Sequence, residues 1–447
     1  MKKVYYFLFA AIGLASCSNE DVFEAPESVN NNAVEELNPN RRTYAEALEI
    51  AQKSITMLQD SAAITRGEAA DRSLNLVNGV KAVCQPVTRA NGTSNDTVLY
   101  VFNFNDDKGF ALVSANRATT GLLAVIEKGS YDPNVEVSNP LVADFLQDMA
   151  DYAANAESKE EVTLTRSYSP KMTFDENNIN TVRNGNGAKV YTTSYKIEPA
   201  IKVQWAQTGI PAEECKYDWA GSGPVALFQV MSVFREPMND YITTSYAKSA
   251  TAILMDKKKW DFFCSIVNSD NRSNPNKAIL FKDFSMIFRE LGHRSKAIYS
   301  KGKTTTEIGN LLATMSGLGY TVGPIRNYDK NNHDDALSIR NCLKNGCIVV
   351  MQGTDKKTGT SHTFVIDGGE YETIVVEGYV NNLCVSKNTT KENYLHHINW
   401  GEAGKYDGLY FANTFSPKYN NNSRKTTFDG KKFDFSYNMS YFSVSHK

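Results

Sequence analysis

Apolar residues recur at helical spacing near the start of the chain and at strand spacing soon after. Between residues 43 and 58 they recur every three or four positions, which predicts an amphipathic helix. Thr43 and Glu46 have the spacing of a capping box in its first turn. The runs that follow predict three strands and a second helix, over residues 98–104, 110–114, 122–127 and 140–154. Together they predict a small α+β block over residues 41–156.

In the second half of the chain, helices come first and strands follow. Helical periodicity predicts helices over residues 224–234, 248–268, 281–291, 304–316 and 334–344. Short apolar runs then predict strands over residues 347–352, 362–366, 373–378, 395–399 and 409–411. Helices followed by a twisted antiparallel sheet indicate a second α+β domain over residues 196–447.

A polar stretch rich in Ser, Thr and Asn separates the two blocks, over residues 157–195. Its low apolar content and its Arg166 and Lys171 predict an exposed linker that a protease can cut. A length of 447 residues also fits two domains preceded by an export segment.

Composition narrows the possible partners. The chain has 41% hydrophobic and 22% charged residues, which is typical of a globular protein. A net charge of -2 gives no strong field for nucleic acid or for an anionic membrane surface, so neither is expected as a partner. The cysteines other than Cys17 are scattered without a C-x-x-C pair, so no zinc site is suggested. Export would permit disulfides, and buried free thiols fit as well.

One segment places a nucleophilic side chain at the start of an apolar helix. Gly221 and Gly223 flank Ser222, and Pro224 begins the helical run. Unpaired N–H groups and the positive end of the helix dipole stabilise an anionic nucleophile or a developing oxyanion there. A serine at this position is also a common helix cap, so the pattern alone leaves both roles open.

Two further segments carry a base and a residue that could orient it. His362 begins an apolar strand after a polar loop, and Asn399 precedes Trp400 at the end of another strand. An asparagine side chain can orient an imidazole through a hydrogen bond, and an indole next to that bond can shield it from water. By spacing alone, a histidine on a strand is more often structural than catalytic.

These segments resemble the streptopain family of papain-like cysteine peptidases. Members of that family share four sequence motifs: Gly-Cys-x-x-x-Ala-x-x-Gln-Ile-Met, His-x-x-Val-Ile-Asp-Gly, Asn-Trp-Gly and Trp-Gly-Gln. The matching positions here are Gly221, Ala226, Gln229, Met231, His362, Val365, Ile366, Asp367, Gly368, Asn399, Trp400, Gly401, Trp205 and Gln207. Residues 100–104 and 108–114 are similar to the family's inhibitory prodomain.

The resemblance implies a papain-like peptidase domain behind a prodomain that inhibits it within the same chain. It implies protein or peptide substrates, Ser222 at the nucleophile position, His362 as the general base and Asn399 as the residue that orients it. Gln207 would supply the side-chain donor of the oxyanion hole, and Trp400 would shield the histidine and asparagine. No cofactor is implied.

Two departures from the family pattern matter. Glu402, Ala403 and Gly404 stand where the family usually continues Trp-Gly-Gly. Ser222 stands where the family has cysteine. A serine hydroxyl stays neutral where a cysteine forms a thiolate, so we expect little or no peptidase activity from this chain. A natural pseudopeptidase and a deliberate Cys-to-Ser change both fit the sequence.

Other residues and other functions compete with this interpretation. Cys215 lies in a polar segment whose glutamates would raise its thiol pKa, so it is a poor alternative nucleophile. His396 and His397 lie on the asparagine-bearing segment and are expected to pack, and Asp367 is expected at a turn or strand end. A non-catalytic protein that binds peptides at the cell surface is the main alternative, and a structural or adhesion lipoprotein is a weaker one.

The N-terminus predicts export. Lys2 and Lys3 precede a short apolar segment, and residues 14–17 end in Cys17 and resemble a bacterial lipobox, which predicts a signal peptide over residues 1–17. A plain secretory signal that contains a cysteine is the alternative. The polar residues 18–40 predict a flexible tether, and their acidic start resembles the surface-export signals of Bacteroides-type bacteria. The chain is therefore predicted to be an outer-membrane or cell-surface lipoprotein, which contacts the membrane through a lipid on Cys17 alone.

Overall fold

A computed structural model describes residues 40–446 except for these segments: 66–79, 90–91, 132–139, 156–186, 236–256, 267–274, 301–302, 329–332, 356–360, 381–382, 413–426, 429–430 and 433–436. The predicted signal peptide, the lipidation site at Cys17 and nearly all of the tether therefore lie outside the described residues. Among the described helices, none combines the length and hydropathy needed to cross a membrane.

The N-terminal region, residues 40–155, pairs two helices with four antiparallel strands. Its elements in chain order are α1 (Tyr44–Thr65), β1 (Val80–Arg89), β2 (Gly92–Asn103), β3 (Phe110–Ser114), β4 (Leu122–Ile126) and α2 (Pro140–Asn155). The predicted capping box forms, because Glu46 N–H donates to Thr43 Oγ1 at 3.3 Å and Thr43 N–H donates to Glu46 Oε2 at 2.8 Å. Strand β1 falls where no strand was predicted.

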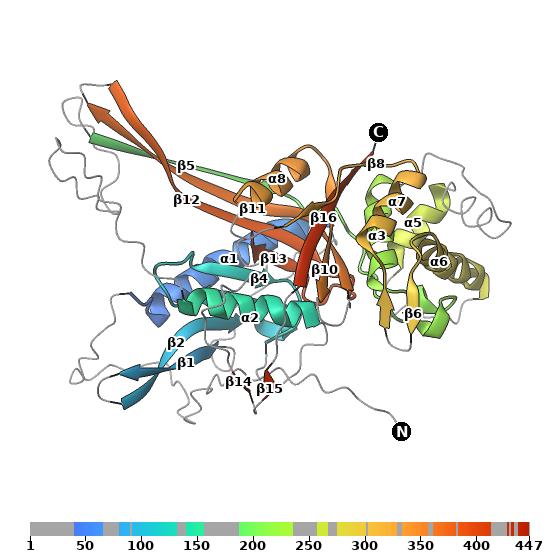
Figure 1. The fold of residues 1–447 in the computed structure, drawn as a ribbon, viewed down its shortest axis with the longest axis horizontal. Coiled ribbons are helices and arrows are strands. Elements are labelled where there is room, and N and C mark those ends of the chain that lie inside the picture. Colours follow the sequence, from blue (N-terminus) through green and yellow to red (C-terminus); the bar gives the residue numbers. More distant parts are fainter. Residues whose placement is uncertain are drawn as a thin grey trace.

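The helices of the C-terminal region, residues 187–446, gather mainly at one end of the molecule (Figure 1). They are α3 (Ser222–Phe234), α5 (Lys257–Ser265), α6 (Pro275–Arg294), α7 (Ile308–Gly317) and α8 (His333–Lys344). Helix α7 begins later than predicted, because residues 304–305 belong to a hairpin of β6 (Ile298–Ser300) and β7 (Lys303–Thr305). Helix α8 lies apart from the others, against the sheet.

The strands of the C-terminal region are longer than their apolar runs suggest. They are β5 (Gly187–Ile197), β8 (Thr321–Val322), β9 (Arg326–Asn327), β10 (Ile348–Asp355), β11 (Ser361–Val380), β12 (Leu383–Asn399), β13 (Gly408–Phe411), β14 (Thr427–Phe428), β15 (Lys431–Lys432) and β16 (Tyr437–Ser445). The two strands predicted at 362–366 and 373–378 are one strand, β11. The segment predicted as a linker ends in β5, which pairs with β11 from Gly187 to Ile197.

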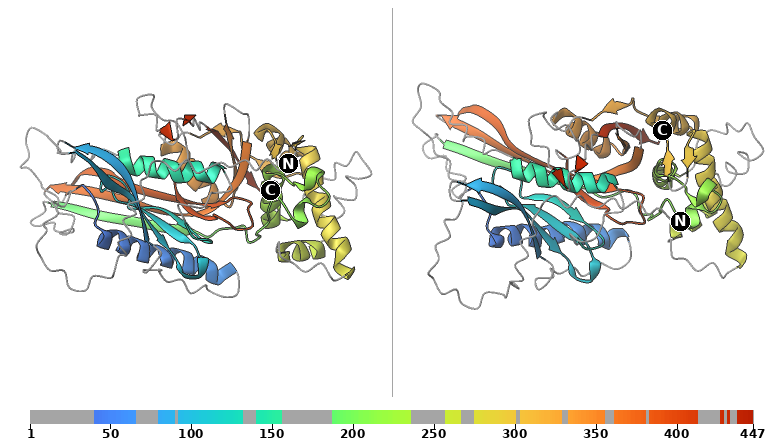
Figure 2. Two further views of the ribbon diagram at one scale, coloured as in Figure 1. Left: turned by 90° about the horizontal axis from the view of Figure 1, so that it is seen from below. Right: turned by 60° about the horizontal axis from the view of Figure 1, so that its bottom comes forward.

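A single antiparallel sheet runs through both regions. Its order is β1-β2-β3-β4-β13-β12-β11-β10-β16-β8, so β4 of the N-terminal region pairs directly with β13 of the C-terminal region. Figure 2 shows the strands of the two regions side by side in two further views. The N-terminal region therefore extends the sheet of the C-terminal region.

Two hydrophobic cores follow from this arrangement. The larger core combines both regions, from Ala47 in α1 to Tyr441 in β16. The smaller core lies among the helices and centres on the buried rings of Trp205, Phe228 and Trp260. The N-terminus of α3 lies between the sheet and this helical core, and α3 contacts β11 and β10 on one side and α6 and α7 on the other.

Candidate active site

Ser222 is the first residue of α3 and is buried there. Gly221 precedes it with a φ of 89°, a conformation that L side chains rarely adopt. A Cβ at Gly221 would also lie 2.8 Å from Thr304 Cγ2, so the tight turn requires glycine. The serine side chain thus projects from a helix N-terminus, as the sequence predicts.

Strand β11 brings His362 next to this helix start. The backbone N–H of Thr363 donates to Ser222 Oγ at 3.1 Å, which fixes the hydroxyl one residue from His362. Thr363 is itself anchored, because Gln352 Nε2 donates to Thr363 Oγ1 at 2.9 Å and to the carbonyl of Thr306 at 2.8 Å. Ser222 therefore bonds to the residue that follows His362, although the two segments lie far apart in the sequence.

The imidazole of His362 contacts a backbone carbonyl. Its Nε2 lies 3.3 Å from Trp400 O, and a carbonyl only accepts, so Nε2 carries the proton and Nδ1 is the ring's acceptor. Burial lowers the pKa of His362 to about 4, and the hydrogen bond to Trp400 opposes this only in part. The ring is therefore neutral at neutral pH.

The side chain of Asn399 forms its hydrogen bonds with residues other than His362. Its Oδ1 accepts from Gln229 Nε2 at 2.8 Å and from Gly401 N–H at 3.0 Å. In this state the carbonyl of Trp400 holds the imidazole, a role that the sequence assigned to the Asn399 side chain. Gln229, in α3, is a site residue whose contact the sequence did not predict.

Trp400 is fully buried beside the histidine. Its ring centroid lies 6.1 Å from that of His362 and 4.7 Å from that of Phe364. Its indole N–H donates to Tyr410 Oη at 3.2 Å, and its backbone N–H donates to Asp407 Oδ1 at 2.8 Å. The indole covers one side of the imidazole, which matches the predicted shielding position.

Gln207 lies next to the start of α3, and its amide is engaged. Ala220 N–H donates to Gln207 O at 2.8 Å, which holds this residue beside Gly221. The side chain donates from Nε2 to Glu402 Oε1 at 2.7 Å. Burial raises the pKa of Glu402 despite this bond. The glutamate that departs from the family pattern thus contacts the predicted oxyanion donor.

The competing residues lie in other surroundings. Cys215 Sγ contacts Pro211 O at 3.6 Å, and burial raises the pKa of the thiol to about 12, with a smaller contribution from Glu214. His396 Nδ1 lies 3.1 Å from Tyr371 Oη, and burial lowers the pKa of His396 to about 3. Neither residue has the surroundings of a nucleophile or a base.

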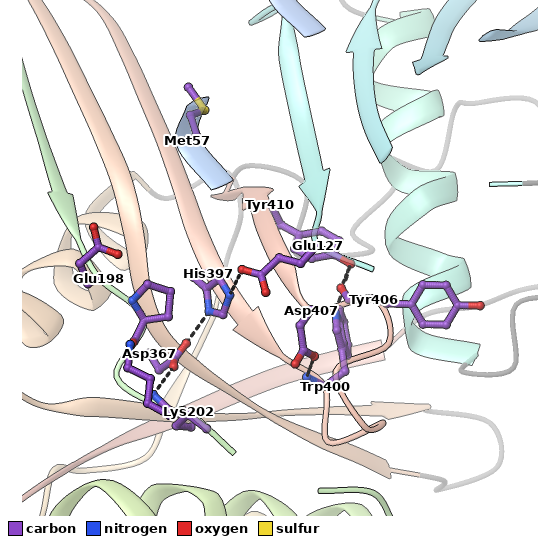
Figure 3. A network of polar contacts seen from close by, with 12 residues as sticks. Met57, Glu127, Glu198, Lys202, Asp367, His397, Trp400, Tyr406, Asp407 and Tyr410 are labelled. Carbon is purple, nitrogen blue, oxygen red and sulfur yellow. Dashed lines mark hydrogen bonds and ion pairs between the residues drawn. The ribbon is translucent and has the colours of Figure 1, made fainter. Parts of the chain in front are cut away.

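A second polar cluster lies where β4 meets the C-terminal sheet (Figure 3). His397 Nδ1 lies 2.6 Å from Asp367 Oδ1, and its Nε2 lies 3.2 Å from Glu127 Oε1. Asp367 was expected at a turn or strand end; that expectation is wrong, because Asp367 lies within β11 and is 2% exposed. An acidic residue directly after the apolar run at 364–366 was the signal for a buried partner.

Ser222, His362 and Gln207 lie around the start of α3, as the candidate site requires. The geometry offers a helix N-terminus, an imidazole whose Nδ1 is an acceptor nitrogen, and a carboxamide near the same turn. Within the described residues, no group of His, Cys, Asp and Glu side chains could hold a metal ion. Chemistry at this site thus depends on the side chain at position 222.

Comparison with known proteins gives two family matches. The Peptidase C10 family matches residues 202–410, and the family described as Spi protease inhibitor matches residues 33–153. Among solved structures, the chain is similar to a mutant fragment of prointerpain A from Prevotella intermedia. That match has 17% sequence identity and a TM-score of 0.44, and covers 80% of this chain and 98% of that chain. No curated protein matches the chain.

Proposed function

Because the chain belongs to the Peptidase C10, or streptopain, family and carries a Spi-type inhibitor domain ahead of its peptidase domain, we propose that it is a self-inhibited peptidase scaffold silenced at the nucleophile. Ser222 holds the nucleophile position, His362 is the base, and Gln207 is the oxyanion donor. Peptides or proteins are the substrate class that this site fits.

The hydrogen bond from Thr363 N–H to Ser222 Oγ carries the proposal. It joins the helix start to the strand that holds His362, which is the pairing that a nucleophile and base require. A cap serine would instead occupy the N-cap position, whereas the N-cap of α3 is Gly221 and Ser222 is the first residue of the helix.

A cysteine at this position would be activated by the same surroundings. The helix N-terminus and an adjacent imidazolium lower a thiol pKa, so a thiolate would be present before substrate binds. The thiolate would attack the scissile carbonyl, the oxyanion would take N–H donors at the turn, and His362 would protonate the leaving amine. Trp400 would keep water from the imidazole.

Serine fails in this setting for two reasons. Its hydroxyl must lose a proton during attack, and a histidine whose pKa is held to about 4 is a weak base for that proton. The hydrogen bond to the carbonyl of Trp400 offsets only part of the cost of burying an imidazolium, and a neutral serine adds no charge to stabilise it. We therefore infer that the chain as written hydrolyses peptides at a negligible rate.

The inhibitor domain supports a zymogen organisation. Phe145 of α2 packs against Trp400, with ring centroids 5.2 Å apart, and also against Phe364 and Tyr410. These rings lie next to His362, so release of α2 would change the packing behind the base. We propose that a cut within residues 157–186 begins that release.

We also propose that the chain is exported and lipidated on Cys17. The apolar segment and lipobox-like residues support this. Incorporation of labelled palmitate that is lost in Cys17→Ala would support lipidation, and equal labelling of both chains would exclude that site.

A peptide-binding pseudopeptidase is the second candidate. Glu402 on the amide of Gln207 favours it, because a donor engaged by a carboxylate is less available to an oxyanion. Calorimetry of the chain cut in its linker should then give peptide binding without turnover. A cut chain that binds no peptide would exclude this candidate.

The test of the main proposal compares four variants of the full chain: the parent, Ser222→Cys, Ser222→Ala and Ser222→Cys combined with His362→Ala. We expect self-cleavage in the linker and casein digestion from Ser222→Cys alone. Digestion by the parent at a similar rate would refute silencing at Ser222. Equal inactivity of all four, with native thermal unfolding, would refute the site assignment.

A further inference from the structure

The N-terminal region contributes a strand, β4, to the edge of the sheet in the peptidase domain. Strand β4 pairs with β13 through Ala124 with Tyr410, Val125 with Leu409, and Ile126 with Gly408. The pairing continues one residue further, where Glu127 N–H donates to Asp407 O at 2.8 Å. In strand addition, the main-chain bonds supply affinity but little selectivity, so selectivity must come from side chains.

The side chain of Glu127, the residue after β4, contacts a buried pair formed by His397 and Asp367. Glu127 Oε1 lies 3.2 Å from His397 Nε2, and Asp367 Oδ1 lies 2.6 Å from Nδ1 on the other side of the ring (Figure 3). The Asp367 side chain is 0% exposed and that of His397 is 5% exposed. Asp367 Oδ2 also accepts the N–H of Ile201 at 2.7 Å, which fixes the carboxylate.

The hydrogen-bond partners of His397 determine the charge of its imidazole ring. A neutral imidazole has one N–H, whereas both nitrogens of His397 face carboxylate oxygens. Burial alone lowers the pKa of His397, but Asp367 and Glu127 outweigh it and raise that pKa to about 10. A third carboxyl, Asp407, also faces the ring, and burial raises its pKa to about 7.

Glu127 is the one member of this cluster that the N-terminal region supplies. Asp367 and His397 lie on the neighbouring strands β11 and β12, and Asp407 precedes β13. When β4 leaves, the His397 Nε2–H loses its acceptor while Asp367 stays in place. The peptidase domain therefore keeps a fixed cationic donor at the end of the β13 edge.

We propose that His397, held by Asp367, is a carboxylate-binding subsite that selects the strand added to β13. Its occupant in this chain is the β4 segment ending in Glu127, and the site fits a strand followed immediately by an acidic side chain. Lys196, whose Nζ donates to Met57 O at 3.1 Å, is a second contact between the regions that does not use this subsite. This inference rests on the proposed self-inhibition but requires no peptidase activity.

The test measures how fast the two regions separate. A recognition sequence for a site-specific protease is placed within residues 157–186 of the parent chain, the chain is cut, and loss of the N-terminal region from the immobilised C-terminal region is followed. Glu127→Gln keeps the size of the side chain but removes its charge. We expect the region to dissociate at least about tenfold faster, because losing one partner of a desolvated charge pair acts mainly on the off-rate.

Asp106→Asn is the matched control, since Asp106 is an exposed carboxylate of the same region that pairs with Lys108. We expect its off-rate to stay within about twofold of the parent. Combining Glu127→Gln with His397→Gln should add nothing beyond His397→Gln alone. Off-rates that are equal for the parent and Glu127→Gln would overturn the subsite.

A second measurement uses the uncut chain. The pKa of His397, followed by NMR, should fall in Glu127→Gln and stay unchanged in Asp106→Asn. An unchanged pKa would overturn the subsite even if the off-rate differed. Neither readout depends on turnover, so failure of the proposed peptidase function leaves this test valid.

Discussion

Two histidines of the peptidase domain are packed within protein but differ in charge. His362, the proposed base, contacts the carbonyl of Trp400, and burial lowers its pKa to about 4. His397, at the junction with the inhibitor domain, lies between two carboxylates that raise its pKa to about 10. Burial acts in the same direction on both rings, so the neighbouring anion decides the charge. Ser222 is neutral, whereas a cysteine at the same position could supply an anion beside His362.

The largest expected change follows from supplying that anion. In Ser222→Cys, a thiolate beside His362 should raise the pKa of His362 by several units, as Asp367 does for His397. NMR titration of the ring checks this, with Ser222→Ala as the control. A pKa that stays near the parent value would mean that position 222 and His362 do not interact.

The next effect comes from removing the anion that His397 already has. Asp367→Asn leaves a buried imidazolium with a weaker partner, so the free energy of unfolding should fall by about 3–5 kcal/mol. Urea denaturation measures it. Asp261→Asn, which breaks the exposed pair with Arg235, should cost about 0–1 kcal/mol. Equal losses in both variants would contradict the contrast between buried and exposed pairs.

The pH dependence of stability gives a smaller effect. His397 binds its proton more tightly in the folded state, so its contribution is complete below its ordinary pKa of 6.5 and is lost as pH rises through about 10. The difference in Tm between the parent and His397→Gln should therefore shrink from pH 7 to pH 10. A difference that grows over this range would have the wrong sign.

The smallest effect is expected at Glu402. Its carboxylate bonds to Gln207 and not to His362, so Glu402→Gln should change the pKa of His362 by less than about one unit. The same NMR titration measures it. A change as large as that in Ser222→Cys would show that Glu402, and not position 222, controls the base.

Local patterns predicted much of the fold. The capping box at Thr43, the strands at 110–114 and 122–127, and the helix behind Ser222 all follow from short-range spacing, and the structure confirms them. The length of β11 did not follow, because its second half is polar and is stabilised by pairing with β5 and β12. Pairing partners are distant in sequence and leave no periodic signal in a polar strand.

The sequence proposed members for the site but not their contacts. Resemblance pointed to Ser222, His362 and Asn399, yet the bond that Asn399 makes with Gln229 spans 170 residues. The contact of His397 with Glu127 spans 270 residues and crosses the two domains. Such contacts depend on sheet order, which apolar runs do not specify.

The most direct test of the central claim is the mass of the intact protein after incubation with a peptide-like electrophile. The account predicts that Ser222→Cys gains one adduct, that the parent gains none, and that Ser222→Cys combined with His362→Ala reacts far more slowly. If Ser222→Cys remains unmodified while its thermal unfolding matches the parent, Ser222 does not occupy a nucleophile position and the account is wrong.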